Sequence, residues 1–199
     1  MKALIENILY YDYISWYNVH VLWRSPFLDW LLPFIRNQWT WAPLYVFLLA
    51  FMLINFGKRG ALWCVFFLLT FAISDQISAH FLKEFFQRTR PCFDPNFSKL
   101  CRLLVPCGGG YSFPSSHAAN HFALAVFSIY SLQDKGKWIM PVFIWWATMV
   151  CYAQVYVGVH FPLDVIFGAL VGIFVGGITG KLFFKNIHLE LPLNNEEIN

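Results

Sequence analysis

The sequence predicts an all-α membrane protein, a polytopic bundle of five transmembrane helices preceded by amphipathic helices in the membrane interface. Of its 199 residues, 58% are apolar and 13% are charged, whereas roughly a quarter of the residues of a soluble domain are charged. The apolar residues also occur in long blocks, near the ~20 residues that cross ~30 Å of hydrocarbon. These observations exclude an ordinary soluble protein, and the length leaves room for one domain.

Residues 1–37 are predicted to form interfacial helices. Within residues 4–23, apolar side chains recur at helical spacing with polar residues between them, which is typical of an amphipathic helix lying in the interface. A sixth span over these residues is the alternative. A second short helix is expected from Ser25 to Arg36, with Ser25 as N-cap and Pro26 in its first turn. The polar residues of the first helix are Glu6, Asp12, Ser15 and Asn18.

The transmembrane catalytic domain is predicted to occupy residues 38–185, and residues 186–199 are predicted to form a polar cytoplasmic tail. Five apolar blocks of this domain have about the length of a membrane span. A glycine-rich basic turn at residues 57–60 separates the first two blocks. The predicted spans are Trp41–Phe56, Ala61–Leu82, Ser115–Leu132, Trp138–Val157 and Pro162–Phe184.

Charge sets the predicted orientation of the spans. The short basic turns at residues 57–60 and 133–137 fall on one side, which the positive-inside rule places in the cytoplasm. The long loop 83–114 and the turn 158–161 then face outward. The long loop is itself basic, against this bias, and an anion site on the outward face would account for the exception.

The five cysteines fall into two groups. Cys64 and Cys151 lie in apolar blocks and are expected to be buried. Cys92, Cys101 and Cys107 share the polar loop, and an odd number of thiols there cannot all pair. One disulfide is expected if the loop faces an oxidising compartment. A zinc site is the alternative, disfavoured because no histidine lies near these cysteines in the sequence.

Three polar groups stand at predicted helix ends on the outward face. The first is Lys83 with Arg90-Pro91, the second is residues 114–117, Pro-Ser-Ser-His, and the third runs from His160 to Asp164. Proline and serine suit the first turn of a helix, where free N–H groups and the helix dipole bind anions. The histidine of the second group adds a side chain that exchanges a proton near neutral pH. An anion cradle beside a titratable group predicts phosphate chemistry.

The ordered motifs Lys-x6-Arg-Pro, Pro-Ser-x-His and His-x3-Asp resemble those of the type 2 phosphatidic acid phosphatase family, whose superfamily includes the vanadium haloperoxidases. The resemblance covers roughly residues 60–180. It implies that His160 is the nucleophile and forms a phosphohistidine, while Asp164 orients the imidazole and steadies its charge. It implies that His117 protonates the leaving oxygen as general acid.

The same resemblance assigns Lys83, Arg90 and the Ser115–Ser116 backbone to the phosphate oxygens. Ser116 stands where the family more often has glycine. Phosphoryl transfer depends mainly on positioning and charge stabilisation, so the chemistry needs these residue types. The resemblance implies no metal and no other cofactor, and no carboxylate cluster suited to magnesium is evident in the sequence.

The third motif departs from the family pattern, because Ala153 and Gln154 stand where the family usually has Ser-Arg. The usual arginine donates to the phosphate, and a charged hydrogen bond is worth ~1.5–3 kcal/mol. Its loss would therefore cost roughly ten- to a hundred-fold in rate. Gln154 still donates, but as a neutral group. We hypothesise that Arg88, a spare cation near Arg90, supplies the missing charge.

Three further polar residues have structural interpretations beside functional ones. His121, four residues after His117, is interpreted as a supporting or packing residue rather than as half of a metal pair. His80 is expected to shape the pocket or meet lipid headgroups. Asp75 lies inside a predicted span, which makes it a functional candidate, and pairing with a neighbouring helix is the structural alternative.

The sequence thus predicts an integral membrane lipid phosphatase with its site on the outer face of a bacterial-type plasma membrane. The resemblance suggests phosphatidate, phosphatidylglycerol phosphate, undecaprenyl pyrophosphate or a lipid A phosphate as substrate. The alternatives are a lipid phosphotransferase with the same site and a non-catalytic lipid-phosphate binder. With a net charge of +3 and scattered basic residues, nucleic acid is not an expected partner. Nothing in the sequence specifies an oligomeric state.

Overall fold

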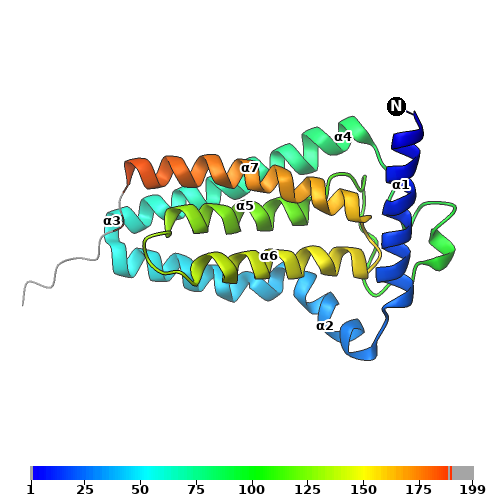
Figure 1. The fold of residues 1–199 in the computed structure, drawn as a ribbon. Coiled ribbons are helices and arrows are strands. Elements are labelled where there is room, and N and C mark those ends of the chain that lie inside the picture. Colours follow the sequence, from blue (N-terminus) through cyan, green and yellow to red (C-terminus); the bar gives the residue numbers. More distant parts are fainter. Residues whose placement is uncertain (1, 188, 190–199) are drawn as a thin grey trace, which may run out of the picture.

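The computed structural model describes residues 2–187 and Leu189, and all regular structure within them is helical. Figure 1 shows α5 (Ser116–Ser131), α6 (Ile139–Tyr156) and α7 (Pro162–Asn186) running alongside α3 (Ala42–Asp75) in one bundle. The predicted all-α fold is confirmed. Most of the predicted tail, residues 188 and 190–199, lies outside the described residues.

The N-terminal helix lies across one end of the bundle. Figure 1 shows α1 (Lys2–Tyr17) crosswise to α5, α6 and α7, and a π-helical turn, Asn18–Leu22, extends it. Trp16 is buried, as expected for the apolar face. Asp12, counted above among the polar residues of this helix, is also buried, with 4% of its surface exposed. It is buried because it forms an ion pair and a hydrogen bond beneath α1, described below.

The second helix, α2 (Pro26–Arg36), packs against α6. The hydroxyl of Ser25 accepts the backbone N–H of Leu28 at 3.2 Å, and Pro26 stands in the first turn. Both features were predicted, because a capping hydroxyl and a proline at the first position suit a helix start. A short 3₁₀ turn, Gln38–Trp41, then leads into α3.

The long helix α3 folds back on itself at Gly57. Its backbone there has φ +50°, in a region that favours glycine. At Gly60, a Cβ would overlap the carbonyl of Met52, so the two arms pack closely side by side. The arms correspond to the first two predicted spans. The second arm continues through a π-helical turn, Gln76–Leu82, into α4 (Lys83–Phe86). A 3₁₀ turn, Ser98–Leu100, lies in the loop that follows α4.

Helix α5 is the centre of the bundle, and most of its side chains are buried. Four glycines on one face of α7 allow it to pack directly against the α5 backbone. A Cβ at any of them would overlap atoms of α5, including the carbonyls of Ser115, Ala119 and Ala123. Small residues repeated every four positions permit such close approach of membrane helices. The glycines are Gly168, Gly172, Gly176 and Gly180.

Among the residues that the structure describes, three helical segments are long and apolar enough to cross a membrane. They are residues 38–86, a stretch of 49 residues that includes the bend at Gly57, residues 139–156 and residues 162–186. Helix α5 has 16 residues, which span only about 24 Å at 1.5 Å per residue. The count of five crossings therefore stays a prediction.

Candidate active site

His160 lies in the turn between α6 and α7 and is 2% exposed. Its Nδ1 is 3.5 Å from a carboxylate oxygen of Asp164, and its Nε2 is 3.2 Å from Nη1 of Arg90. Because the guanidinium only donates, Nε2 is the acceptor and Nδ1 carries the proton. Burial lowers the pKa of His160 to about 4; the charge of Arg90 acts in the same direction, while Asp164 opposes it. The ring is therefore neutral at neutral pH, with the electron pair on Nε2.

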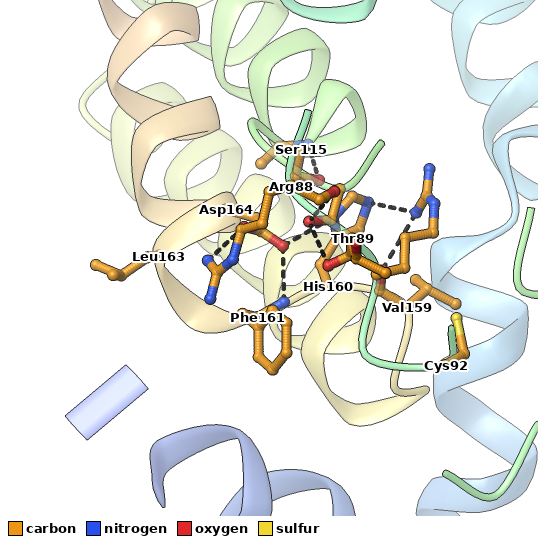
Figure 2. A network of polar contacts seen from close by, with 12 residues as sticks. Arg88, Thr89, Cys92, Ser115, Val159, His160, Phe161, Leu163 and Asp164 are labelled. Atoms are coloured by element: carbon orange, nitrogen blue, oxygen red, sulfur yellow. Dashed lines mark hydrogen bonds and ion pairs between the residues drawn. The ribbon is translucent and has the colours of Figure 1, made fainter. Parts of the chain in front are cut away.

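Asp164 is completely buried in the first turn of α7. One carboxylate oxygen accepts the backbone N–H of Phe161 at 2.9 Å, and the other accepts Nη1 of Arg88 at 2.7 Å. Figure 2 shows these contacts beside His160. The carboxylate is thus held from two sides, as required of a group that orients a histidine.

Arg88 lies between two carboxylates rather than beside Nε2 of His160. Its second terminal nitrogen contacts Asp12 of α1 at 2.6 Å, and its guanidinium lies 4.2 Å from the centre of the Phe161 ring. Burial acts against its charge, but Asp164 and Asp12 together raise the pKa of Arg88. Asp12 also accepts the backbone N–H of Leu163 at 2.8 Å. The only local signal for this role is that Asp12 is a charged residue in a largely apolar helix.

Arg90 is 7% exposed and is fixed by backbone carbonyls. It donates to the carbonyls of Gly109 and Gly110 at 3.2 and 3.3 Å, and to that of Val159 at 3.2 Å. These bonds leave its Nη1 in contact with His160. The glycine run before the second motif therefore supports the arginine of the first motif.

The first turn of α5 is joined directly to the first turn of α7. The backbone N–H of Ser115 donates to the carbonyl of Asp164 at 2.8 Å, and its hydroxyl accepts the N–H of Ala118 at 3.4 Å. Pro114 lies before this cap rather than in the first turn, because the helix begins at Ser116. The buried hydroxyl of Ser116 has no hydrogen-bond partner among the described residues. A capped helix start with a spare hydroxyl can bind an anion.

His117 lines a cavity of about 520 Å³ between the two arms of α3 and α5. Most of the lining is apolar, including Tyr45 and Phe67. Behind it, Nδ1 of His121 donates to the carbonyl of His117 at 2.8 Å, and Nε2 lies 3.5 Å from the Tyr45 hydroxyl. Both ring nitrogens of His121 thus have protein partners, which agrees with a supporting residue.

Asp75 has a partner on the neighbouring helix, since it accepts the side-chain amide of Asn120 at 2.8 Å. Both residues line the cavity that contains His117. His80 is exposed. Within the part of the chain that the structure describes, no three or more His, Cys, Asp or Glu side chains are grouped so as to hold a metal ion.

Lys83 and Gln154 complete the predicted set. Lys83 is half-buried, and its charge acts on His117 and His160. Gln154 is completely buried, and neither atom of its amide group has a hydrogen-bond partner among the described residues. A buried amide without partners costs free energy, so a ligand that bonds to it would be favoured.

Cys92 and Cys107 form a disulfide, with 6.2 Å between their Cα atoms. Cys101 is free, so one bond forms among the three loop cysteines, as expected. The bridge links the chain just after Arg90 to the chain just before Gly109. Cys151 is buried as predicted, and Cys64 is partly buried.

A model of the PAP2 superfamily matches residues 61–188. Among curated relatives, a lipid A 4'-phosphatase of Bacteroides thetaiotaomicron is 34% identical over 168 residues, which are 83% of this chain and 72% of that protein. An undecaprenyl-diphosphatase of Sulfolobus acidocaldarius is 31% identical over 158 residues, covering 78% and 70%. The crystal structure of Aquifex aeolicus LpxE aligns with a TM-score of 0.64 and 28% identity, covering 83% of this chain and 92% of that one.

Proposed function

The chain belongs to the PAP2 superfamily, and from this premise we propose that it is a membrane lipid phosphatase that acts through a phosphohistidine. The observation that carries the proposal is the environment of His160. A neutral imidazole has Asp164 at one nitrogen and Arg90 at the other. The unprotonated nitrogen, Nε2, is therefore the nucleophile, and the arginine that donates to it is a cation that attracts phosphate.

The proposed reaction has two steps. In the first, Nε2 of His160 bonds to phosphorus as the bond from phosphorus to the lipid oxygen breaks, and protonated His117 gives its proton to that oxygen. In the second, water attacks phosphorus, His117 takes a proton from the water, and the phosphorus–nitrogen bond breaks. Asp164 offsets the positive charge that the imidazole carries between the steps.

We propose that side-chain cations, without a metal ion, bind the phosphate oxygens. Lys83 and Arg90 supply positive charge. The Ser115–Ser116 turn supplies the backbone N–H of Ser116 and its hydroxyl, which is unpaired among the described residues, because the N–H of Ser115 is bonded to the carbonyl of Asp164. Such fixed donors stabilise the charge that develops during phosphoryl transfer. We place the site on the outer face of the membrane. The disulfide between Cys92 and Cys107 supports this placement, because disulfides persist in oxidising compartments.

The proposed substrate is a lipid phosphate monoester or pyrophosphate. The lipid A 4'-phosphatase and the undecaprenyl-diphosphatase similar to this chain both act, by their names, on phosphorylated lipids. The largely apolar cavity beside His117 suits the apolar part of such a substrate. Lipid A 4'-phosphate is the first compound to test, and undecaprenyl diphosphate is the second.

The test is phosphate release by purified protein in detergent, with and without EDTA, from both lipids, phosphatidate and phosphatidylglycerol phosphate. His160→Ala should abolish release, while His80→Ala, a change at an exposed histidine, should not. A phosphoenzyme stable to base and labile to acid should form in the wild type. Release that persists in His160→Ala, or that EDTA abolishes, would contradict the mechanism.

Two other candidate functions use the same residues. A phosphotransferase would pass the phosphoryl group to an acceptor lipid, and adding such lipids to the assay separates it from a hydrolase. A non-catalytic binder is motivated by Gln154, which replaces the usual arginine. A binder would hold lipid phosphates without turnover, and His160→Ala would bind them as well as the parent does.

A further inference from the structure

Arg36, the last residue of α2, carries a partly buried guanidinium outside the predicted site. Its Nε is buried and has no hydrogen-bond partner among the described residues. Burial lowers the pKa of Arg36, the charge of Arg90 lowers it further, and no carboxylate of the described part of the chain acts against either. Buried cations are normally paired, so this one needs a reason.

The inner face of α2 lies against the segment that holds the site. Leu32 precedes Arg36 by four residues and therefore shares its face of the helix. Leu32 is 2% exposed and belongs to a packed cluster that includes Ala153 and Val159. These two residues are the chain neighbours of Gln154 and His160. Arg36 thus belongs to a helix that packs beside Gln154, the residue that stands where the family usually has arginine.

The position of α2 does not depend on the Arg36 side chain. Near its start, Asp29 accepts the Tyr156 hydroxyl at 2.8 Å and pairs with Arg102. At its end, Thr40 and Trp41 donate to the carbonyls of residues 34 and 35 at 2.8 and 2.7 Å. An arginine in the last turn of a helix commonly bonds to such carbonyls. Here other donors satisfy them.

The charge of Arg36 acts on Arg90 and on His117. Arg90 contacts the proposed nucleophile, and His117 is the proposed general acid. A second arginine close enough to act on this pair is unfavourable in an empty site and favourable when a phosphate anion is bound among the cations. Arg88, in contrast, has both terminal nitrogens on carboxylates.

We propose that Arg36 binds a phosphate oxygen of the substrate and replaces, from α2, the arginine that the family usually carries at the position of Gln154. Gln154 then serves as a neutral donor beside it. The inference rests on the proposed function for the identity of the anion. It assigns a phosphate-binding residue to the N-terminal region, outside the three family motifs.

The test combines removal of the arginine with its relocation. Orthovanadate, an analogue of pentacoordinate phosphorus, serves as the probe, by its inhibition constant and by the increase in melting temperature that it causes. Arg36→Ala should weaken orthovanadate inhibition and raise KM, each by roughly ten- to a hundred-fold, as expected for a charged hydrogen bond. Arg36→Lys should retain part of the affinity. Lys99→Ala removes an equal charge from an exposed position in the loop 83–114 and should change neither value.

Adding Gln154→Arg to Arg36→Ala should restore most of the lost affinity, which a purely structural role of Arg36 would not predict. Unchanged inhibition and KM in Arg36→Ala, or no recovery in the double variant, would overturn the inference. If Arg36→Ala does not fold, Arg36→Gln with the same measurements decides.

Failure of the proposed function gives a different result. In that case, the wild type releases no phosphate from any lipid, yet orthovanadate still raises its melting temperature and does not raise that of Arg36→Ala. Equal orthovanadate effects on the two proteins would reject the role of Arg36, whether or not the wild type is active.

Discussion

Asp12 accepts the backbone N–H of Leu163 at 2.8 Å, across 151 positions of the sequence. The bond joins α1 to the first turn of α7, one residue before Asp164. Since Asp12 also pairs with Arg88, and Arg88 with Asp164, the crosswise helix is connected to the base of the candidate site. Residues of α1, the loop 83–114 and α7 are therefore joined in one network of hydrogen bonds and ion pairs.

Asp12→Ala should both destabilise the protein and slow the reaction. It removes a charged hydrogen bond to Leu163 and one partner of Arg88, and a bond of this kind is worth about 2 kcal/mol. Asp12→Asn keeps an acceptor for Leu163 and should lose less. Thermal unfolding and kcat, measured together on both variants, test the link. Activity in Asp12→Ala equal to that of the wild type would show that Asp164 is held without α1.

His117→Ala should slow release from lipid phosphates by about a hundredfold or more, as is usual for loss of a general acid. The same variant should be affected much less with p-nitrophenyl phosphate, because its phenolate leaves without a proton. His160→Ala should lose both activities, since the nucleophile serves every substrate. Equal losses of His117→Ala on the two substrates would argue against a general-acid role.

The pH dependence of kcat/KM should reflect the low pKa of His160. Only the neutral ring is a nucleophile, so the acid limb should fall as pH drops through about 4 rather than through the ordinary value of 6.5. Between pH values of about 4 and 6.5, His160 binds a proton in the unfolded chain but not in the folded protein. The free energy of unfolding therefore rises with pH over this range.

Arg90→Gln removes a charge that lowers this pKa, while Asp164 and Lys83 still act on the ring. Its acid limb should therefore lie at higher pH than that of the wild type. The pKa of the substrate phosphate is measured separately, so that its contribution to the pH profile can be removed. An acid limb of the wild type near 6.5 would count against a buried neutral nucleophile.

Gly176→Ala should destabilise the bundle, whereas Gly177→Ala should not. A Cβ at Gly176 would overlap the Ala123 carbonyl, while at Gly177 the nearest atom is 3.9 Å away. Overpacking costs about 1–3 kcal/mol, and an unobstructed Gly→Ala change in a helix gains up to about 1 kcal/mol. Thermal unfolding of the two variants in one detergent provides the comparison. Similar melting temperatures would mean that α5 and α7 can separate at little cost.

Replacing Cys92 and Cys107 together by serine should lower stability and weaken phosphate binding. The disulfide closes a loop of 15 residues, for which chain entropy predicts about 3 kcal/mol. Gly109 and Gly110, whose carbonyls accept hydrogen bonds from Arg90, lie two and three residues after Cys107, so loss of the bridge should loosen Arg90 and raise KM. Cys101→Ser is the matched control, because that thiol is free. A reductant should affect the wild type and Cys101→Ser alike and leave the double variant unchanged.

Hydropathy and motif spacing predicted much of the fold and the core of the site. The predicted span Pro162–Phe184 corresponds to α7, and the basic turn after Phe56 marks the bend of α3. The family motifs identified Arg90, His160 and Asp164, which the structure brings together. Local signals sufficed here, because apolar blocks and helix starts depend on neighbouring residues.

Long-range partners were harder to predict. Asp12 is buried only because Arg88 and Leu163 meet it from distant parts of the chain, and periodicity within α1 carries no trace of them. From the sequence, Arg36 is indistinguishable from an ordinary cation in the last turn of a helix. The glycines of α7 did carry a signal, a four-residue spacing from Gly168 to Gly180, which indicates close helix packing.

The glycine stripe of α7, formed by Gly168, Gly172, Gly176 and Gly180, has a consequence for where lipid preference is determined. It fixes the separation of α5 and α7, and hence the separation of His117 and His160, to which we assign the chemistry. The cavity beside His117 is also bounded by α3, which contributes bulky apolar side chains, and neither glycine of α3, Gly57 or Gly60, lies against α5. We therefore expect substitutions of the α3 side chains to alter lipid preference, and substitutions between α5 and α7 to alter stability instead.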